Sequence, residues 1–314
     1  MRLTDWFLSA SFLAMTVAGC SFILPPTNSL VTSERQCSSS LPRTFHDQDT
    51  QTTTGDYSGI SFSGRTVEIA KIIDVLPVLS RLDALQQSSE THNLQFFELR
   101  QSLSDRLLLT MFEVSSAVAE IVCERDRADQ AADRMEEFDA TLVKRLTLVS
   151  IVIGGVASVV SGGIGLAGGA STASDAAEVG SGVLASLFGG TALFAGSKQD
   201  FRHERNLLKE VWNHPRQSSI FSPAVWRFLQ RKYENHTSTG IDGVINAWRQ
   251  QGRLGEPGSS GEKDRIDLFF GTGGTYSATD LRARASMLET LEAHIQLMSE
   301  ELELFVREII QPRM

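Results

Sequence analysis

Residues 151–172 read IVIGGVASVVSGGIGLAGGAST, an apolar stretch without charge in which glycine recurs at short intervals. The charge-free run extends past this stretch on both sides, and a second such run follows an acidic tip at Asp175 and Glu178. The first run exceeds the roughly 20 residues that a membrane-spanning helix needs, and the second is near the roughly 17-residue lower limit. We therefore predict a helical hairpin over residues 146–197.

Small residues recur every four positions in both arms of this predicted hairpin. They are Gly154, Ser158 and Gly162 in the first arm, and Gly182, Ser186 and Gly190 in the second. Small side chains let two helix backbones approach closely, which favours helix association in lipid. In water, each glycine costs a helix about 1 kcal/mol relative to alanine. The pattern favours membrane insertion or self-association, and the closely packed core of a soluble bundle is the alternative interpretation.

Basic residues flank both arms. Lys144 and Arg145 precede the first arm, and Lys198 and Arg202 follow the second. Because anionic lipid headgroups attract lysine and arginine, we expect these four side chains to contact headgroups. Insertion into the inner membrane from outside would place the acidic tip in the cytoplasm, against the positive-inside bias, so an outer-membrane hairpin conflicts less.

Amphipathic helices are predicted before the apolar segment, because hydrophobic residues recur there at intervals of three and four. The first begins at Thr66 and has a kink or break at Pro77. The second runs from Asn93 into the 150s, a length of about 90 Å at 1.5 Å per residue. Its charged stretch at residues 123–139 is typical of a solvated helix face.

Further helices are predicted after the apolar segment. Residues 198–214 form one, and residues 222–251 form one or two shorter ones whose aromatic residues belong to the core. The last helix follows Ser277 and Asp280, which have capping-box spacing, and its apolar residues recur at near-heptad intervals. No strand is predicted.

The expected fold class is all-α, an elongated bundle of long amphipathic helices with a central Gly/Ala-rich hydrophobic helical hairpin. The bundle occupies residues 65–314. Residues 21–64 are rich in serine and threonine and show no sustained periodicity, which indicates a disordered tether.

The first residues, MRLTDWFLSASFLAMTVAGC at 1–20, have an early Arg2 and an apolar centre, as an export signal does. The ending V-A-G-C resembles the lipobox of bacterial lipoproteins, and an ordinary secretory signal is the alternative. The resemblance implies that Cys20 carries lipid and becomes the mature N-terminus. It also implies an outer-membrane location, because Ser21 stands where enterobacterial lipoproteins of the inner membrane carry aspartate.

Two further cysteines, Cys37 and Cys123, would lie in an oxidising compartment after export. They could form a disulfide, and buried free thiols are equally compatible with the sequence.

The sequence contains no recognisable catalytic constellation. The histidines are scattered, and His203-Glu204 lacks the second histidine of an H-E-x-x-H zinc motif. A formal net charge of −9 without a dense basic run argues against nucleic-acid binding. We expect no catalytic residue, no metal, no cofactor and no small-molecule substrate.

These observations predict a non-enzymatic lipoprotein of the bacterial cell envelope, lipid-anchored and facing the periplasm from the outer membrane. Its hairpin would serve membrane insertion or self-assembly, and its partners would be membrane lipid, further copies of itself or another envelope protein. Two alternatives remain. One is a pore-forming or membrane-perturbing effector, because long helices around an apolar hairpin are similar to the layout of α-helical pore-forming toxins. The other is a soluble periplasmic partner-binding module.

Overall fold

The computed structural model describes residue 37 and residues 60–88, 93–166, 196–203, 205–232 and 238–311, with the backbone alone at 149 and 152–166. These residues form a mostly helical fold, which confirms the predicted class at that level. They also contain a two-stranded sheet, which was not predicted.

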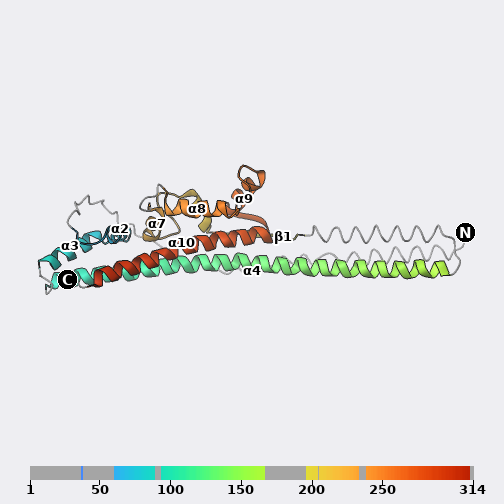
Figure 1. Cartoon of the computed structure of the whole chain (residues 1–314), viewed down its shortest axis with the longest axis horizontal. Coiled ribbons are helices and arrows are strands. Elements are labelled where there is room, and N and C mark those ends of the chain that lie inside the picture. The colour runs from blue at the N-terminus through green and yellow to red at the C-terminus, as the bar shows by residue number, and fades with distance from the viewer. Residues whose placement is uncertain are drawn as a thin grey trace. The chain divides into compact units, whose positions relative to one another are not determined.

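The longest helices are α4 (Leu94–Leu166), with 73 residues, and α10 (Ala278–Ile310), with 33. They lie side by side (Figure 1). The helix predicted from Asn93 into the 150s is thereby confirmed. No glycine or proline precedes Gly154 in α4, so no residue there removes a backbone hydrogen bond or weakens the helix by its conformational freedom.

Helix α10 begins with the predicted capping box. The Ser277 hydroxyl accepts a hydrogen bond from the Asp280 amide at 3.2 Å, and the Asp280 carboxylate accepts one from the Ser277 amide at 3.3 Å. The near-heptad apolar side chains that follow are buried: Leu281, Leu288, Leu291, Ile295, Met298, Leu302 and Phe305. The apolar stripe read from the sequence is therefore the face that α10 turns toward the core.

Ion pairs show that α4 and α10 run antiparallel. Arg125 of α4 pairs with Glu292 of α10 at 2.5 Å, and Asp129 pairs with Arg282 at 3.1 Å, so rising numbers on one helix match falling numbers on the other. The same part of α4 buries three alanines, Ala128, Ala131 and Ala132. The stretch predicted as a solvated face therefore has a buried stripe of small residues beside its charges.

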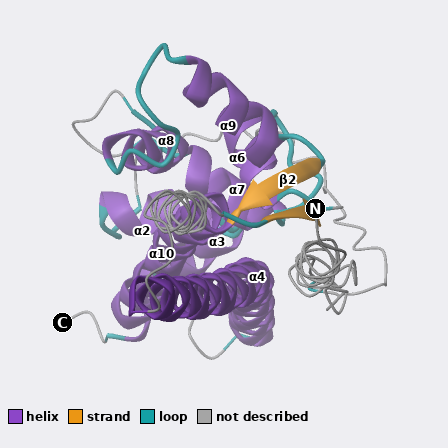
Figure 2. Cartoon of the chain, turned by 90° about the vertical axis from the view of Figure 1, so that its right-hand side faces the viewer, coloured by secondary structure: helices purple, strands orange, loops and turns teal. Residues whose placement is uncertain are grey.

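Shorter helices pack on α4, on α10 and on one another, and α10 lies between α4 and most of this layer (Figure 2). They are α2 (Gly64–Ile72), α3 (Leu76–Gln87), α6 (Leu207–Asn213), α7 (Pro223–Gln230), α8 (Gly240–Gln250) and α9 (Ser260–Phe270). Pro77 stands in the first turn of α3, so it marks the predicted break between two helices. Trp226, Phe228 and Trp248 are buried, as predicted for core aromatics.

The prediction of one helix over residues 198–214 is wrong. Strand β1 (Lys198–Arg202) occupies its first part and pairs antiparallel with β2 (Gly273–Ser277). Helix α6 follows separately. Gly273 permits this pairing, because its φ is +106° and a Cβ there would stand 2.3 Å from the Phe201 carbonyl oxygen.

Two contacts at the N-terminal side fix the beginning of the helical domain. The Ser61 hydroxyl donates to Asp83 at 2.6 Å, and Ser63 caps α2 while its amide donates to Glu308 at 2.7 Å. The last residues of the segment predicted as a tether thus contact the domain. A disulfide joins Cys37 to Cys123 of α4, with the two Cα atoms 5.4 Å apart.

Removal of this disulfide should lower the free energy of unfolding by about 4 kcal/mol, because the bridge closes a long loop in the unfolded chain. Its cysteines are 86 residues apart. Urea unfolding of Cys37→Ser, of Cys123→Ser and of the reduced protein should give the same loss. Equal stability of the oxidised and reduced proteins would contradict the bridge.

Candidate functional site

The two ends of the apolar segment meet at one place on α4. The Ser197 amide donates to both carboxylate oxygens of Asp139, at 3.0 and 3.1 Å. The chain therefore continues along α4 beyond Asp139 and returns to it 58 residues later. This contact defines the base of the segment predicted as a hairpin.

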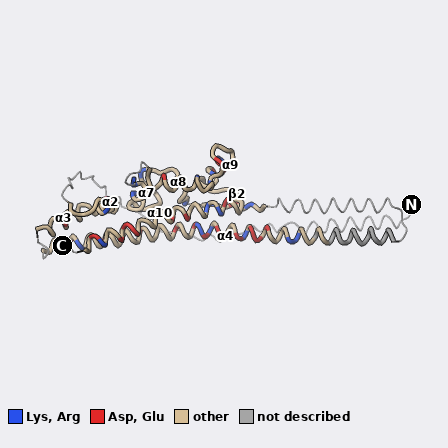
Figure 3. The backbone as a smooth tube through the Cα atoms, in the orientation of Figure 1, with Lys and Arg blue, Asp and Glu red and all other residues tan. Residues whose placement is uncertain are grey.

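The part of α4 that follows the base exposes large apolar side chains. Leu148 is 55% exposed and Ile151 is 63% exposed, whereas Leu146 is buried. Charged residues lie along the part of α4 beside α10 (Figure 3), and the sequence of α4 after Arg145 contains none. Of the residues between Met135 and Phe201 whose side chains are described, 136–148, 150, 151 and 196–200, none belongs to the hydrophobic core cluster.

The structure describes none of the side chains of the six predicted self-association residues. Gly154, Ser158 and Gly162 lie in α4 as helical backbone, and their surroundings are outside the described part. The residues of the second arm, Gly182, Ser186 and Gly190, lie outside the described residues, as do the lipid-attachment residue Cys20 and the tip.

All four predicted headgroup residues are exposed, and three of them, Lys144, Arg145 and Lys198, lie near the base. Lys144 and Arg145 are on α4, five or six residues past Asp139, and an axial rise of about 1.5 Å per residue puts them within about 10 Å of it. Lys198 directly follows Ser197, whereas Arg202 ends strand β1 beside Arg127, about 18 Å along α4 from Asp139 on the side of the packed domain. Arg202 forms an exposed ion pair with Asp200 at 3.1 Å, which contributes little to stability.

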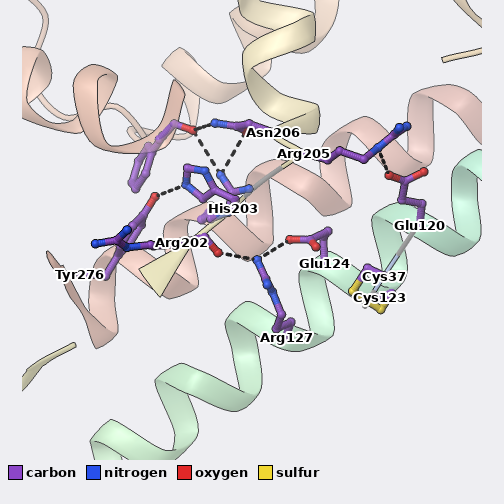
Figure 4. A network of polar contacts seen from close by, with 12 residues as sticks. Cys37, Glu120, Cys123, Glu124, Arg127, Arg202, His203, Arg205, Asn206 and Tyr276 are labelled. Carbon is purple, nitrogen blue, oxygen red and sulfur yellow. Dashed lines mark hydrogen bonds and ion pairs between the residues drawn. A yellow bond between two sulfur atoms is a disulfide. The ribbon is translucent and has the colours of Figure 1, made fainter. Parts of the chain in front are cut away.

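A polar cluster holds the strand that follows the base (Figure 4). The Arg127 guanidinium of α4 donates to the Arg202 carbonyl oxygen at 2.9 Å and to Glu124 at 3.0 Å. It also stacks over the Phe201 ring at 4.6 Å. Burial raises the pKa of the Glu124 carboxyl, and Arg127 opposes that shift. One arginine thus fixes β1 against α4.

His203 follows β1 and is buried against Tyr276 of β2. The Tyr276 hydroxyl donates to the Leu268 carbonyl at 2.9 Å, so it accepts from His203 Nε2, 3.0 Å away. His203 is therefore the Nε2-protonated tautomer, and its Nδ1 is buried without a hydrogen-bond partner among the described residues. Burial, with Arg284 nearby, lowers the pKa of His203 to about 3, and burial raises that of Tyr276 to about 12.

Arg284 of α10 lies fully buried behind this pair. Its guanidinium donates to the Phe269 carbonyl oxygen at 3.2 Å, and burial lowers its pKa. The Asn206 side-chain amide donates to the same carbonyl oxygen at 2.7 Å, and its oxygen caps the N-terminus of α6. Because these side chains are buried among core residues, the cluster is suited to positioning β1 and α6 and not to reaction with an external substrate.

Sequence reasoning missed this cluster, because its members come from segments more than 70 residues apart. His203 was considered only as a metal ligand. Among the residues that the structure describes, no group of three His, Cys, Asp or Glu side chains is placed to hold a metal ion. In the same residues, no helix combines the length and apolarity needed to cross a membrane.

Comparison with protein-family models, with curated proteins and with solved structures finds no match for this chain.

The neutral, buried His203 predicts a loss of stability in acid. Its folded pKa of about 3 lies below the usual 6.5, so only the unfolded chain takes up this proton between those values. The free energy of unfolding should fall as the pH falls from about 6.5 toward 3. Glu124, whose pKa is raised, acts in the opposite sense.

Urea unfolding of the wild type and of His203→Gln at several pH values isolates this contribution. The variant should show a shallower decline in acid than the wild type. His214→Asn, which changes an exposed histidine at the end of α6, serves as the control and should keep the wild-type decline. The same decline in His203→Gln as in the wild type would contradict the buried neutral histidine.

Proposed function

We propose that this protein is a non-enzymatic lipoprotein of the bacterial cell envelope, anchored through Cys20, whose hairpin at residues 146–197 serves membrane insertion or self-assembly. The observation that carries the proposal is the contact between Ser197 and Asp139. It closes a long, largely uncharged segment at its base, as a hairpin requires.

The domain's core supports a function for the hairpin outside that core. Of the hairpin residues whose side chains are described, 146–148, 150, 151, 196 and 197, only Leu146 is buried, and none belongs to the core cluster. Exposed Leu148 and Ile151 then lie on the hairpin side of the base. Burial of such side chains in lipid or against another copy releases about 25 cal/mol for each Å² of apolar surface removed from water.

The leader and the disulfide both support an envelope location. Two acyl chains on Cys20 provide stable anchoring, since each buried CH₂ contributes about 0.8 kcal/mol. Structural disulfides persist in the periplasm and are rare in reducing compartments, so the bridge between Cys37 and Cys123 suits an exported protein. We assign the protein to the outer membrane, facing the periplasm.

The base of the hairpin supports a membrane as the surface that it meets. Lys144, Arg145 and Lys198 are exposed there and can reach phosphate groups of lipid, and Arg202 is exposed at the far end of β1. The partners are therefore membrane lipid and, through the small residues of the arms, a second copy or another envelope protein.

A two-by-two experiment separates the anchor from the hairpin. One change gives the leader a conventional secretory cleavage site and replaces Cys20 with serine, and the other replaces residues 148–195 with a short Gly/Ser linker. Bacterial cells expressing each of the four proteins are fractionated. The protein with hairpin and no anchor should remain with membranes or sediment as an oligomer, and the protein with neither should be a soluble periplasmic monomer.

The same proteins give the outcomes that contradict the proposal. A soluble monomer in the hairpin-only case would exclude the role of the hairpin and leave the anchor untouched. Failure of Cys20 to incorporate labelled fatty acid would exclude the anchor alone. The linker protein should still unfold cooperatively, because the described core lies outside the replaced residues; loss of that transition would make the hairpin part of the core.

Removing the positive charges beside the base of the hairpin should weaken attachment to anionic membranes. Each basic residue near an anionic surface contributes about 1 kcal/mol, so Lys144→Gln with Arg145→Gln should lower vesicle affinity roughly 30-fold. The unanchored protein is sedimented with phosphatidylglycerol vesicles at low salt. Arg216→Gln with Lys263→Gln, two exposed cations away from the base, is the matched control. Equal losses in both pairs would show attraction without a preferred surface.

A further inference from the structure

The disulfide determines where the chain that precedes it joins the domain. Cys123 lies in the packed part of α4, one turn after Glu120 (Figure 4). It precedes Asp139, the base of the hairpin, by sixteen positions, which is about 24 Å of helix. A chain bound to α4 through Cys37 therefore joins the domain close to the hairpin.

A second set of contacts joins the chain to the domain at the start of α2. The Ser61 hydroxyl donates to Asp83 of α3 at 2.6 Å, and the Ser63 hydroxyl donates to Glu308 of α10 at 2.7 Å. The Thr66 hydroxyl donates to the same Glu308 carboxylate at 2.5 Å. These contacts involve neither cysteine, so the start of α2 should keep its place in the reduced protein.

This second attachment point lies farther from the hairpin than the first. Arg125 of α4 pairs with Glu292 of α10, and Glu308 is sixteen residues farther along α10, on the side away from Asp139 because the two helices are antiparallel. At an axial rise of about 1.5 Å per residue, Glu308 lies about 45 Å from Asp139 along the helix pair. The bridge thus moves the attachment point about 20 Å toward the hairpin.

The bridge also shortens the chain between the proposed lipid and the domain. Cys20 and Cys37 are seventeen positions apart, and Cys20 and Ile60 are forty positions apart. An extended chain covers at most about 3.5 Å per residue, so these stretches span at most about 60 Å and 140 Å. With the distance along α4 added, Asp139 can lie at most about 85 Å from the lipidated residue when the bridge is closed, and about 185 Å when it is open.

The bridge can open without removing a part of the hydrophobic core. Both cysteines are only partly buried, so a thiol can approach the sulfur atoms, and the core cluster contains neither of them. Arg205 pairs with Glu120 at 2.9 Å and donates to the Ile220 carbonyl oxygen at 3.2 Å, which holds the neighbouring turn of α4 independently of the bridge. Reduction should therefore lower the stability of the domain and leave its fold in place.

We propose that the disulfide between Cys37 and Cys123 is a redox switch that sets where the lipid anchor joins the domain and how far from the anchor the hairpin can lie. The reductant is a dithiol. It passes two electrons and two protons to the bridge, whose S–S bond breaks to give two thiols, and it becomes a disulfide itself. The inference rests on the proposed anchoring at Cys20 and does not depend on insertion of the hairpin.

Proteolysis of the full-length chain tests the attachment. A recognition sequence for a specific protease replaces residues 46–52, between Cys37 and Ile60, and the protein is labelled with radioactive fatty acid in bacterial cells. Free thiols are alkylated, and the protein is cut. On a non-reducing gel the label should stay with the fragment that contains the domain, because the bridge still joins the two pieces. On a reducing gel the label should move to the short lipopeptide.

The same recognition sequence in place of residues 26–32 is the matched control. A cut there should separate the label from the domain on both gels, because the bridge lies on the other side of the cut.

Reduction without denaturant tests the switch. The folded protein, cut at residues 46–52, is treated with dithiothreitol and alkylated before it is run on a non-reducing gel. The label should leave the domain, and circular dichroism should still show a cooperative unfolding transition in the reduced sample.

The outcomes distinguish this inference from the proposed function. Absence of label in the uncut protein would contradict anchoring at Cys20, and the inference with it. Label that is present in the uncut protein but leaves the domain on the non-reducing gel would contradict the inference alone. A bridge that dithiothreitol opens only in urea would be purely structural, which would also overturn the switch. The decisive comparison uses one protein before and after reduction, so it does not depend on how a cysteine variant folds.

Discussion

One continuous helix, α4, belongs both to the packed domain and to the apolar segment, and the rest of the structure depends on that continuity. Its 73 residues span about 110 Å at 1.5 Å per residue. The domain is built along its first part, where Phe96 and Met135 lie in the core. Because a helix is stiff, the direction in which the apolar segment leaves the domain is set by how α4 packs on α10.

Polar contacts fix that packing more specifically than apolar burial does. Arg282 of α10 faces Asp129, Asp133 and Glu136, one on each successive turn of α4, and burial of small alanines lets the helices approach. A slide of α4 by one turn would exchange these partners. It would also remove Arg127 from β1, so the position of β1 depends on the same packing of α4 on α10.

The buried arginine and histidine are costly in isolation, because a charge taken out of water must be paired or neutralised. His203 meets this cost by staying neutral, and Arg284 meets part of it through the Phe269 carbonyl and the nearby Glu124. Two nitrogens of Arg284 find no hydrogen-bond partner among the described residues. Such a cluster favours one arrangement of β1, β2 and α6 over others more than it adds to total stability.

Local patterns in the sequence predicted the long helices, the capping box at Ser277 and the aromatic core, because each of these depends on residues a few positions apart. The sheet was missed because β1 and β2 are five residues each and pair across a separation that no local period records. The pairing of Cys37 with Cys123, and that of His203 with Tyr276, are likewise long-range. The contact between Asp139 and Ser197 spans 58 residues, so no local pattern in the sequence could predict it.

The most direct test of the account is thiol accessibility along the hairpin in intact cells. Single cysteines are introduced at Ser158, Ser174 and Ser186 with the native disulfide kept, and a membrane-impermeant reagent is applied before and after urea extraction of membranes. The account predicts that Ser174→Cys reacts with the reagent in intact cells, whereas both arm positions stay protected even in urea-extracted membranes. If all three become reactive together as the domain unfolds in urea, the apolar segment is soluble core and the account is wrong.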